Sequence, residues 1–146
     1  MRILVGFTGD AEAAAALAFA GRLAERDAAH LTVIAATAPP AYLTMSAHGA
    51  AARQTLPTDL AHRLGIAVRA LPERIGVTHL LVEGSLSRAL EPTLRREPFD
   101  LLVLTASAAR GRAVRRLVRR TQVPLRVALA EQIECPSGRP TYAEPA

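Results

Sequence analysis

The chain has 146 residues, half of them hydrophobic, and a formal net charge of +5 at neutral pH. This is the length of one domain with a sizeable core, and the composition excludes a disordered chain. Only 3% of the residues are aromatic, which leaves few platforms on which nucleic-acid bases could stack. No apolar run approaches the roughly 20 residues that span a bilayer, and the first residues lack a signal-peptide pattern. We therefore expect a cytoplasmic protein without a membrane partner.

In the first half of the chain, short apolar runs alternate with helical patterns. We expect, in order, a strand at residues 2–7, a helix at 11–28, a strand at 30–36 and a helix at 57–75. Asp10 can cap the first helix, whose alanines favour helix formation. Residues 41–55 form a loose segment that is either a lid over the sheet or disordered. Gly65 and Pro72 weaken the second helix.

The second half of the chain continues the alternation. We expect, in order, a strand at 78–82, a helix capped by Ser85, a strand at 99–104, a short loop at 105–110, a helix at 113–121 and a strand at 123–130. Pro92 should kink the helix in which it lies. Residues 131–146 are rich in turn formers and should form a flexible tail after a domain at 1–130. Such alternation predicts a parallel sheet covered by helices on both faces.

The candidate chemistry lies where the strands end. In a doubly wound sheet, ligands bind beyond the carboxyl ends of the strands, which here fall at Thr8-Gly9, Thr37, Glu83-Gly84 and residues 105–111. The loop after residue 104 is placed to aim its amides, and the amino terminus of the next helix, at a phosphate. However, it contains no glycine before Gly111.

The sequence gives little evidence for catalysis or for metal binding. The single cysteine, Cys135, excludes an internal disulfide and any site built from several cysteines. The four histidines lack the spacing of metal ligands, so we expect no metal. Ser85 only superficially suggests a nucleophile elbow. That motif requires a glycine two positions after the serine, and this chain has Ser87 there. No base, nucleophile or metal ligands converge, and we expect no enzymatic activity.

Residues 2 to about 130 resemble the universal stress protein family. The matching segments are ILVGFTGD, HLTVIAATAP, LLVEGSLSRALEPTL and, at the end, DLLVLTAS with VPLRVAL. The resemblance implies a stress-response protein with a doubly wound five-stranded parallel sheet, order 3-2-1-4-5, and about four helices, an adenine-nucleotide alpha hydrolase-like α/β fold. It also implies a homodimer formed through the last strand, Val123–Ala130. An exposed apolar edge strand agrees with that, because it needs a partner.

Some members of this family bind ATP through a Gly-x2-Gly-x9-Gly-Ser/Thr signature, in which glycines let the backbone approach the phosphates. In this chain Thr105 and Ala108 stand at the first two glycines, Gly111 at the third and Arg112 at the hydroxyl position, in a much shorter loop. Thr8 stands where ATP-binding members carry an acidic residue. We therefore expect no conventional ATP binding and no required cofactor.

The alternative is a switch that binds ATP or another phosphate ligand in an altered geometry. In that hypothesis Arg110 and Arg112 supply the charge that replaces the lost glycine amides. The resulting candidate site comprises Thr8, Gly9, Thr37, Thr105, Arg110, Gly111 and Arg112.

The helix at 113–121 is unusually basic. The chain has no lysine, and six of its 18 arginines lie between positions 110 and 120. Five of them share one broad face of the helix, namely Arg112, Arg115, Arg116, Arg119 and Arg120. The ordinary interpretation is a solvated outer face, and the alternative is a surface for an acidic protein or an anion. Nucleic acid is disfavoured because the helix is short and aromatic residues are few.

Overall fold

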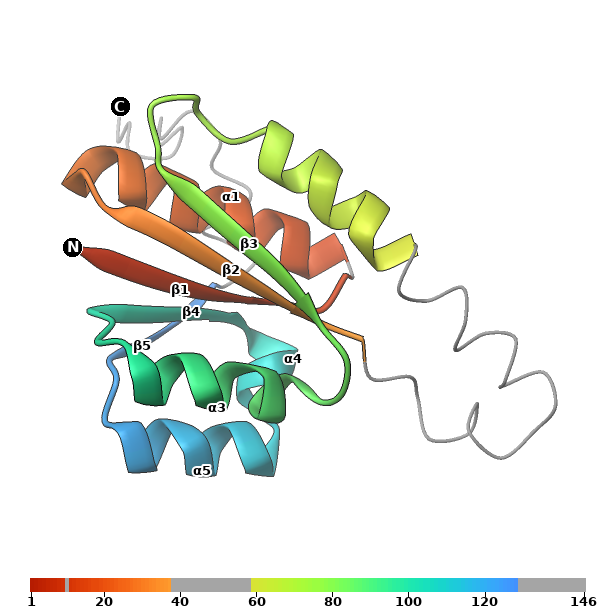
Figure 1. The fold of residues 1–146 in the computed structure, drawn as a ribbon, viewed down its shortest axis with the longest axis vertical. Coiled ribbons are helices and arrows are strands. Elements are labelled where there is room, and N and C mark those ends of the chain that lie inside the picture. The colour runs from red at the N-terminus through yellow and green to blue at the C-terminus, as the bar shows by residue number, and fades with distance from the viewer. Residues whose placement is uncertain (10, 38–58, 129–146) are drawn as a thin grey trace, which may run out of the picture.

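A five-stranded, all-parallel sheet forms the centre of the computed structural model (Figure 1). The structure describes residues 1–9, 11–37 and 59–128. The elements in chain order are β1 (Arg2–Phe7), α1 (Ala11–Asp27), β2 (His30–Ala36), a helix described over residues 59–69, β3 (Val77–Val82), α3 (Leu86–Arg96), β4 (Leu101–Thr105), α4 (Ala106–Ala109), α5 (Arg112–Thr121) and β5 (Leu125–Ala128). The sheet order β3-β2-β1-β4-β5 confirms the expected fold.

Several sequence predictions fall on other parts of the chain. The cap by Asp10, the segment 41–55, the domain boundary at 130 and the tail at 131–146 with Cys135 all lie outside the described residues. Where the structure describes the chain, no helix is long and apolar enough to cross a bilayer.

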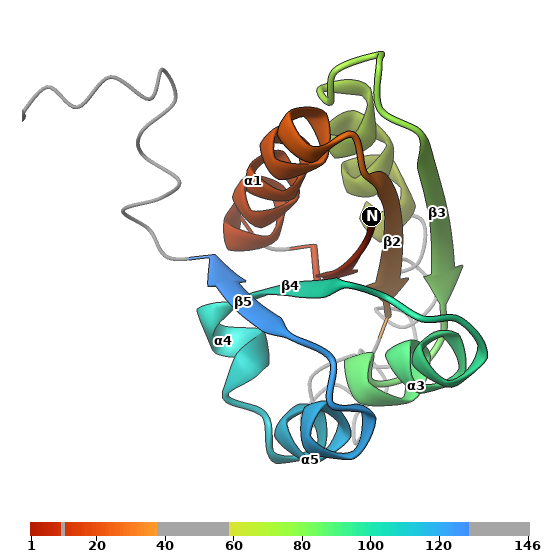
Figure 2. The same cartoon turned by 90° about the vertical axis from the view of Figure 1, so that its left-hand side faces the viewer.

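Helices cover both faces of the sheet, which makes three layers (Figure 2). On one face, α1 and the helix at 59–69 pack on Val5 and Phe7 of β1. On the other face, Leu4 of the same strand belongs to a second buried cluster with residues of α3 and α5. Consecutive side chains of β1 are therefore buried in opposite cores, as the continuous apolar run predicts for a central parallel strand.

The helices follow their sequence patterns. In α1 Leu17, Ala20 and Ala24 share one helical face and are buried, and the charged positions are exposed. Ser85 caps α3 as predicted, because its Oγ accepts a hydrogen bond from the Arg88 amide at 3.5 Å. Pro92 lies inside α3, and the helix continues past it to Arg96.

The edge strand β3 is more exposed than the central strands β1 and β2. It pairs only with β2, and residues 78–81 are exposed. Leu80 is 49% exposed and Leu81 is 41% exposed, although they point to opposite faces. An apolar sequence run alone does not distinguish a central strand from an edge strand, so the exposure of β3 could not be read from the sequence.

Candidate functional site

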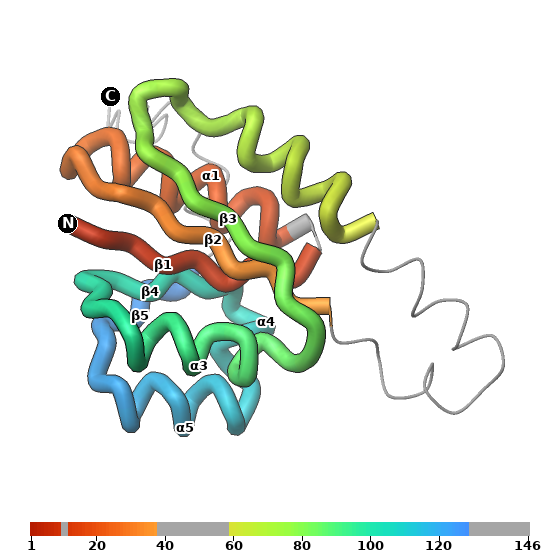
Figure 3. Tube along the Cα trace, in the orientation of Figure 1, coloured from red at the N-terminus to blue at the C-terminus, as the bar shows by residue number. Residues whose placement is uncertain are grey.

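The predicted site lies where β1 and β4 end side by side. These two strands are hydrogen-bonded neighbours, with Val5 opposite Val103. Because they are parallel, both strands end at the same, carboxyl end of the sheet (Figure 3). Thr8 and Gly9 follow β1, and α4 follows β4. A side-chain contact joins the two connections, because Ser107 Oγ donates a hydrogen bond to Glu12 Oε2 over 3.4 Å. The sheet topology therefore places Thr8, Gly9 and Thr105 at the carboxyl ends of two neighbouring strands.

Gly9 is held tightly beneath the helix at 59–69. Its φ is 87°, and its carbonyl oxygen accepts a hydrogen bond from Arg63 Nη1 at 2.7 Å. A Cβ at this position would lie 2.5 Å from Leu60 Cδ1. Arg63 also pairs with Asp59 at 3.3 Å. The backbone after β1 is therefore committed to a turn that only glycine accommodates well, and its carbonyl already has a partner.

Thr37 is tied to the neighbouring strand. Its amide donates to the Val82 carbonyl at 3.2 Å, and its Oγ1 donates to the same oxygen at 3.5 Å. Both polar groups therefore extend the pairing of β2 and β3 past the end of the ladder. The side chain is half-buried. A ligand that used the Thr37 hydroxyl would have to compete with this contact.

The segment after β4 was predicted to be a loop, and this prediction was wrong: residues 106–109 form the short helix α4. Thr105 caps it, because its Oγ1 accepts from the Ala108 amide at 3.2 Å and lies 3.2 Å from Ser107 Oγ. Ala106, Ala108 and Ala109 favour a helical turn, and Ala108 stands where the family signature has its second glycine. Thr105 itself is only 1% exposed, so its hydroxyl serves the cap.

The backbone amides that follow are also engaged within this turn. The Arg110 amide donates to the Ser107 carbonyl and the Gly111 amide to the Ala108 carbonyl, both at 3.3 Å. A phosphate cradle needs several amides that point outward together. Here the amides of Ala108, Arg110 and Gly111 point into their own turn. These three amides are therefore satisfied within the protein, and a phosphate could use them only if the turn opened.

The two arginines of the hypothesis lie on the surface. Arg110 is the exposed C-cap of α4, and Arg112 is the exposed first residue of α5. Gly111 between them is the N-cap of α5 and offers no side-chain hydrogen bond to it. Arg112 also lines a shallow hollow on the outer face of α5, together with Arg115, Arg116 and Arg119.

Three side chains near this end of the sheet are not among the residues predicted from the sequence: Glu12, Arg63 and Ser107. Glu12 places a carboxylate beside Ser107, and Arg63 reaches Gly9 from a helix that is distant in the sequence. Glu12 in the first turn of α1 is explained locally by the helix dipole. Nothing in the sequence indicates its contact with Ser107 or the contact of Arg63 with Gly9. A carboxylate at this place disfavours a phosphate ligand.

No metal chemistry emerges where the structure is described. Among those residues, no group of three or more His, Cys, Asp or Glu side chains could hold an ion. His30 lies at the start of β2, where its Nε2 is 3.0 Å from Thr78 Oγ1. This is an ordinary hydrogen bond at a strand end. At the same end of the sheet, a second surface hollow is lined by Glu25, His30 and Arg74 among others.

Comparison with known proteins places this fold in a family. The universal stress protein family matches residues 1–128. No curated protein matches the chain. Among solved structures, the universal stress protein UspA from Lactobacillus plantarum has a TM-score of 0.62 and 20% sequence identity, covering 88% of this chain and 97% of that one.

Two further structures resemble the chain at similar levels. A universal stress protein in complex with cAMP has a TM-score of 0.55 and 19% identity, over 88% of this chain and 97% of that one. A universal stress protein family member from Burkholderia pseudomallei has a TM-score of 0.51 and 23% identity, over 87% and 94%. At such identities these likenesses establish a shared fold.

Proposed function

The chain belongs to the universal stress protein family, and we propose that it acts in the stress response as a non-catalytic homodimer that works through contacts with other proteins. In this proposal it resides in the cytoplasm, needs no cofactor and does not bind ATP in the way that the family's glycine signature allows. The dimer forms through the edge strand β5, which among the described residues pairs only with β4 and presents an exposed Leu125.

The observation that carries the proposal is the folded connection after β4. Thr105 is buried as a helix cap, and the amides of Ala108, Arg110 and Gly111 donate within the same turn. A nucleotide that used these groups would first have to break that turn. Thr105 is the buried member of this turn, and breaking its cap would leave a buried hydroxyl without that partner, at a cost of about 1–3 kcal/mol that would subtract from the binding free energy.

Thermal unfolding of the purified protein tests this proposal. AMP and cyclic AMP are each compared with an equal concentration of inorganic phosphate. ATP is compared with an equal concentration of tripolyphosphate. A ligand that binds only the folded state stabilises it by about 2.7 kcal/mol at a hundredfold excess over Kd. We expect each nucleotide to raise the unfolding temperature no more than its adenosine-free control does. A larger shift with AMP or cyclic AMP than with inorganic phosphate, or with ATP than with tripolyphosphate, would contradict the proposal.

A second candidate function is a nucleotide-binding switch. It is favoured by the structural likeness to a universal stress protein in complex with cAMP and by the position of Arg110 and Arg112 next to the carboxyl edge of the sheet. In this alternative the adenosine-dependent shift appears and is lost in Arg112→Ala. Arg69→Ala, in the opposite helical layer, serves as the matched control and keeps the shift.

A further inference from the structure

The net charge of the protein is concentrated in one layer. Residues 83–126, which form α3, α4, α5, β4 and the start of β5, contain ten arginines and four carboxylates. The other described residues contain six arginines and five carboxylates. One side of the sheet is therefore nearly neutral, and the side that carries α3 and α5 holds almost the whole excess of positive charge.

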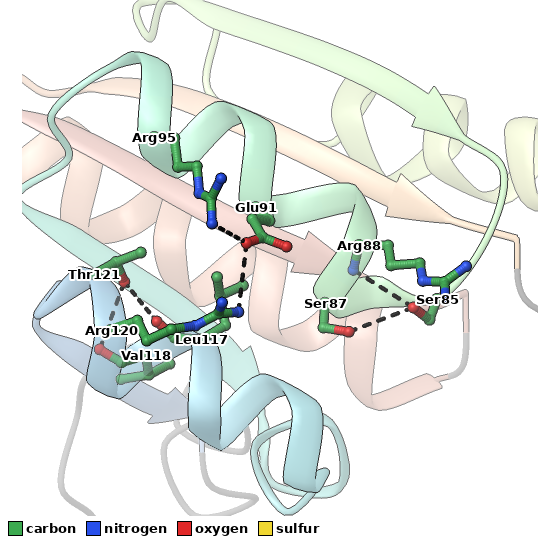
Figure 4. Close-up of polar contacts among 9 residues, drawn as sticks. All are labelled: Ser85, Ser87, Arg88, Glu91, Arg95, Leu117, Val118, Arg120 and Thr121. Atoms are coloured by element: carbon green, nitrogen blue, oxygen red, sulfur yellow. Dashed lines mark hydrogen bonds and ion pairs between the residues drawn. The ribbon is translucent and has the colours of Figure 1, made fainter.

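Within that layer, one arginine of α5 forms an ion pair with another described residue and four do not. Arg120 of α5 lies 3.4 Å from Glu91 Oε1 of α3, which also pairs with Arg95 of α3 at 2.7 Å (Figure 4). The other four, which we call the arginine stripe, line the hollow on the outer face of α5: Arg112, Arg115, Arg116 and Arg119. Within the described part of the chain, none of these four forms an ion pair with a carboxylate.

The arginine stripe weakens the free helix. Each of its members has two others three or four residues away, and like charges at those spacings are destabilising in a helix. The first turn of α5 carries no acidic residue, although the helix dipole favours one there. The helix is held in place by Val114 and Leu117, which are buried against the sheet layer. A bound anion would relieve the repulsion that the free protein carries.

The shape and chemistry of the stripe decide which kind of anion fits. The hollow has a volume of about 220 Å³, is lined only by the four arginines, and follows the helix for about 10 Å from Arg112 to Arg119. Guanidinium groups bind phosphate oxygens in a bidentate fashion. A single phosphate would occupy only part of such a row. A short chain of phosphates brings several charges within the same length.

The same surface suits an acidic protein or a nucleic acid less well. Stable protein interfaces contain a desolvated core, commonly with aromatic anchors, and the lining of this hollow offers no apolar side chain. Binding of single-stranded nucleic acid relies on bases that stack on aromatic rings, and none lines the hollow. We propose that the arginine stripe of α5 is a binding site for a free linear oligophosphate.

The test is calorimetric titration of the whole protein with tripolyphosphate in a low-salt buffer. Arg115→Gln/Arg119→Gln removes two charges from the stripe, and Arg69→Gln/Arg74→Gln removes two exposed charges from the opposite layer. We expect the first variant to bind about tenfold more weakly or worse, and the second to remain within about twofold of the wild type. Equal weakening in both variants would overturn the proposal, because binding would then depend only on net charge.

A second variant keeps the charge and changes only its geometry. Arg115→Lys/Arg119→Lys retains the net charge but loses the bidentate fork, so we expect weaker binding than in the wild type. Binding as tight as in the wild type would contradict a site built on guanidinium geometry. Both variants should unfold at or above the wild-type temperature, because the change to Gln relieves repulsion and the change to Lys conserves the charge.

Competing ligands complete the experiment. Inorganic phosphate, a polyglutamate peptide and a short DNA duplex are titrated under the same conditions. We expect each to bind more weakly than tripolyphosphate, per mole of ligand. Tighter binding of polyglutamate would assign the stripe to an acidic protein, and tighter binding of DNA would assign it to nucleic acid. Equal binding of inorganic phosphate would reduce the site to a single-anion contact, and each of these outcomes would overturn the oligophosphate assignment.

Discussion

Gly9 links the end of β1 to the helix at 59–69 and shows how one residue holds this edge of the sheet. Its φ of 87° is unfavourable for any residue with a Cβ, and the added atom would lie 2.5 Å from Leu60 Cδ1. We expect Gly9→Ala to lower the free energy of unfolding by about 1–2 kcal/mol, with most of the loss coming from backbone strain, since the end of the Leu60 side chain can move. Urea denaturation measures this change.

Gly65 is the matched control for that substitution. It lies within the helix at 59–69, where a Cβ would meet only the Arg69 side chain at 3.6 Å, an ordinary contact distance. Alanine is a better helix former than glycine, so Gly65→Ala should raise the free energy of unfolding by about 0.5–1 kcal/mol. Two glycine-to-alanine changes of the same sign would contradict this account of Gly9.

Thr105 decides whether the connection after β4 is a fixed structure. Thr105→Val keeps the shape of a buried side chain but removes the oxygen that accepts from the Ala108 amide. We expect a loss of about 1–2 kcal/mol in the free energy of unfolding by urea denaturation. Thr121→Val is the control, because Thr121 Oγ1 donates to the Leu117 and Val118 carbonyls near the end of α5 and caps no amide, so the change should alter the stability by less than about 0.5 kcal/mol. An unchanged stability in Thr105→Val would mean that α4 is not held by its cap, which would favour the nucleotide-switch alternative.

At the scale of elements, α5 has a buried apolar side and an outer side on which neighbouring arginines repel one another. Arg116 has Arg112 and Arg119 as neighbours on the arginine stripe, and alanine has the higher helix propensity. Arg116→Ala should therefore raise the free energy of unfolding by about 0.3–1 kcal/mol at low ionic strength, and less at high ionic strength, where the repulsion is screened. Denaturant unfolding at two salt concentrations measures it. A destabilised variant would contradict the repulsion on which the oligophosphate proposal rests.

The elements also show how far the sequence alone predicts this molecule. Periodic patterns such as those of β1, α1 and β2 predicted their elements almost residue by residue, because each buries a continuous or regularly spaced apolar face. The four-residue α4 was missed because it is too short to show a period, and its alanines and Thr105 cap are compatible with a loop. The contacts of Arg63 with Gly9 and of Ser107 with Glu12 join residues far apart in the sequence. Only the fold could reveal them.

At the scale of the whole molecule, the sheet has two edges, and the dimer proposal concerns one of them. The strand β5 presents Leu125, 37% exposed, next to the exposed Arg126. The opposite edge, β3, presents Leu80 and Leu81, which are exposed to a greater extent. Because an unpaired strand invites pairing with another chain, both edges compete for a partner, and the sheet order alone does not choose between them.

Light scattering of two edge variants at micromolar concentration makes the choice. Leu125→Lys places a second positive charge beside Arg126, and the twofold symmetry of a dimer repeats it on the partner, so pairing through β5 should fail. We expect the wild type to have twice the monomer mass of 15.5 kDa and Leu125→Lys to fall to that mass, while Leu80→Lys stays dimeric. A wild-type mass near 15.5 kDa would refute the homodimer. Loss of the dimer only in Leu80→Lys would move the interface to β3, and the exposed leucines of that edge would then be explained by their burial in the partner.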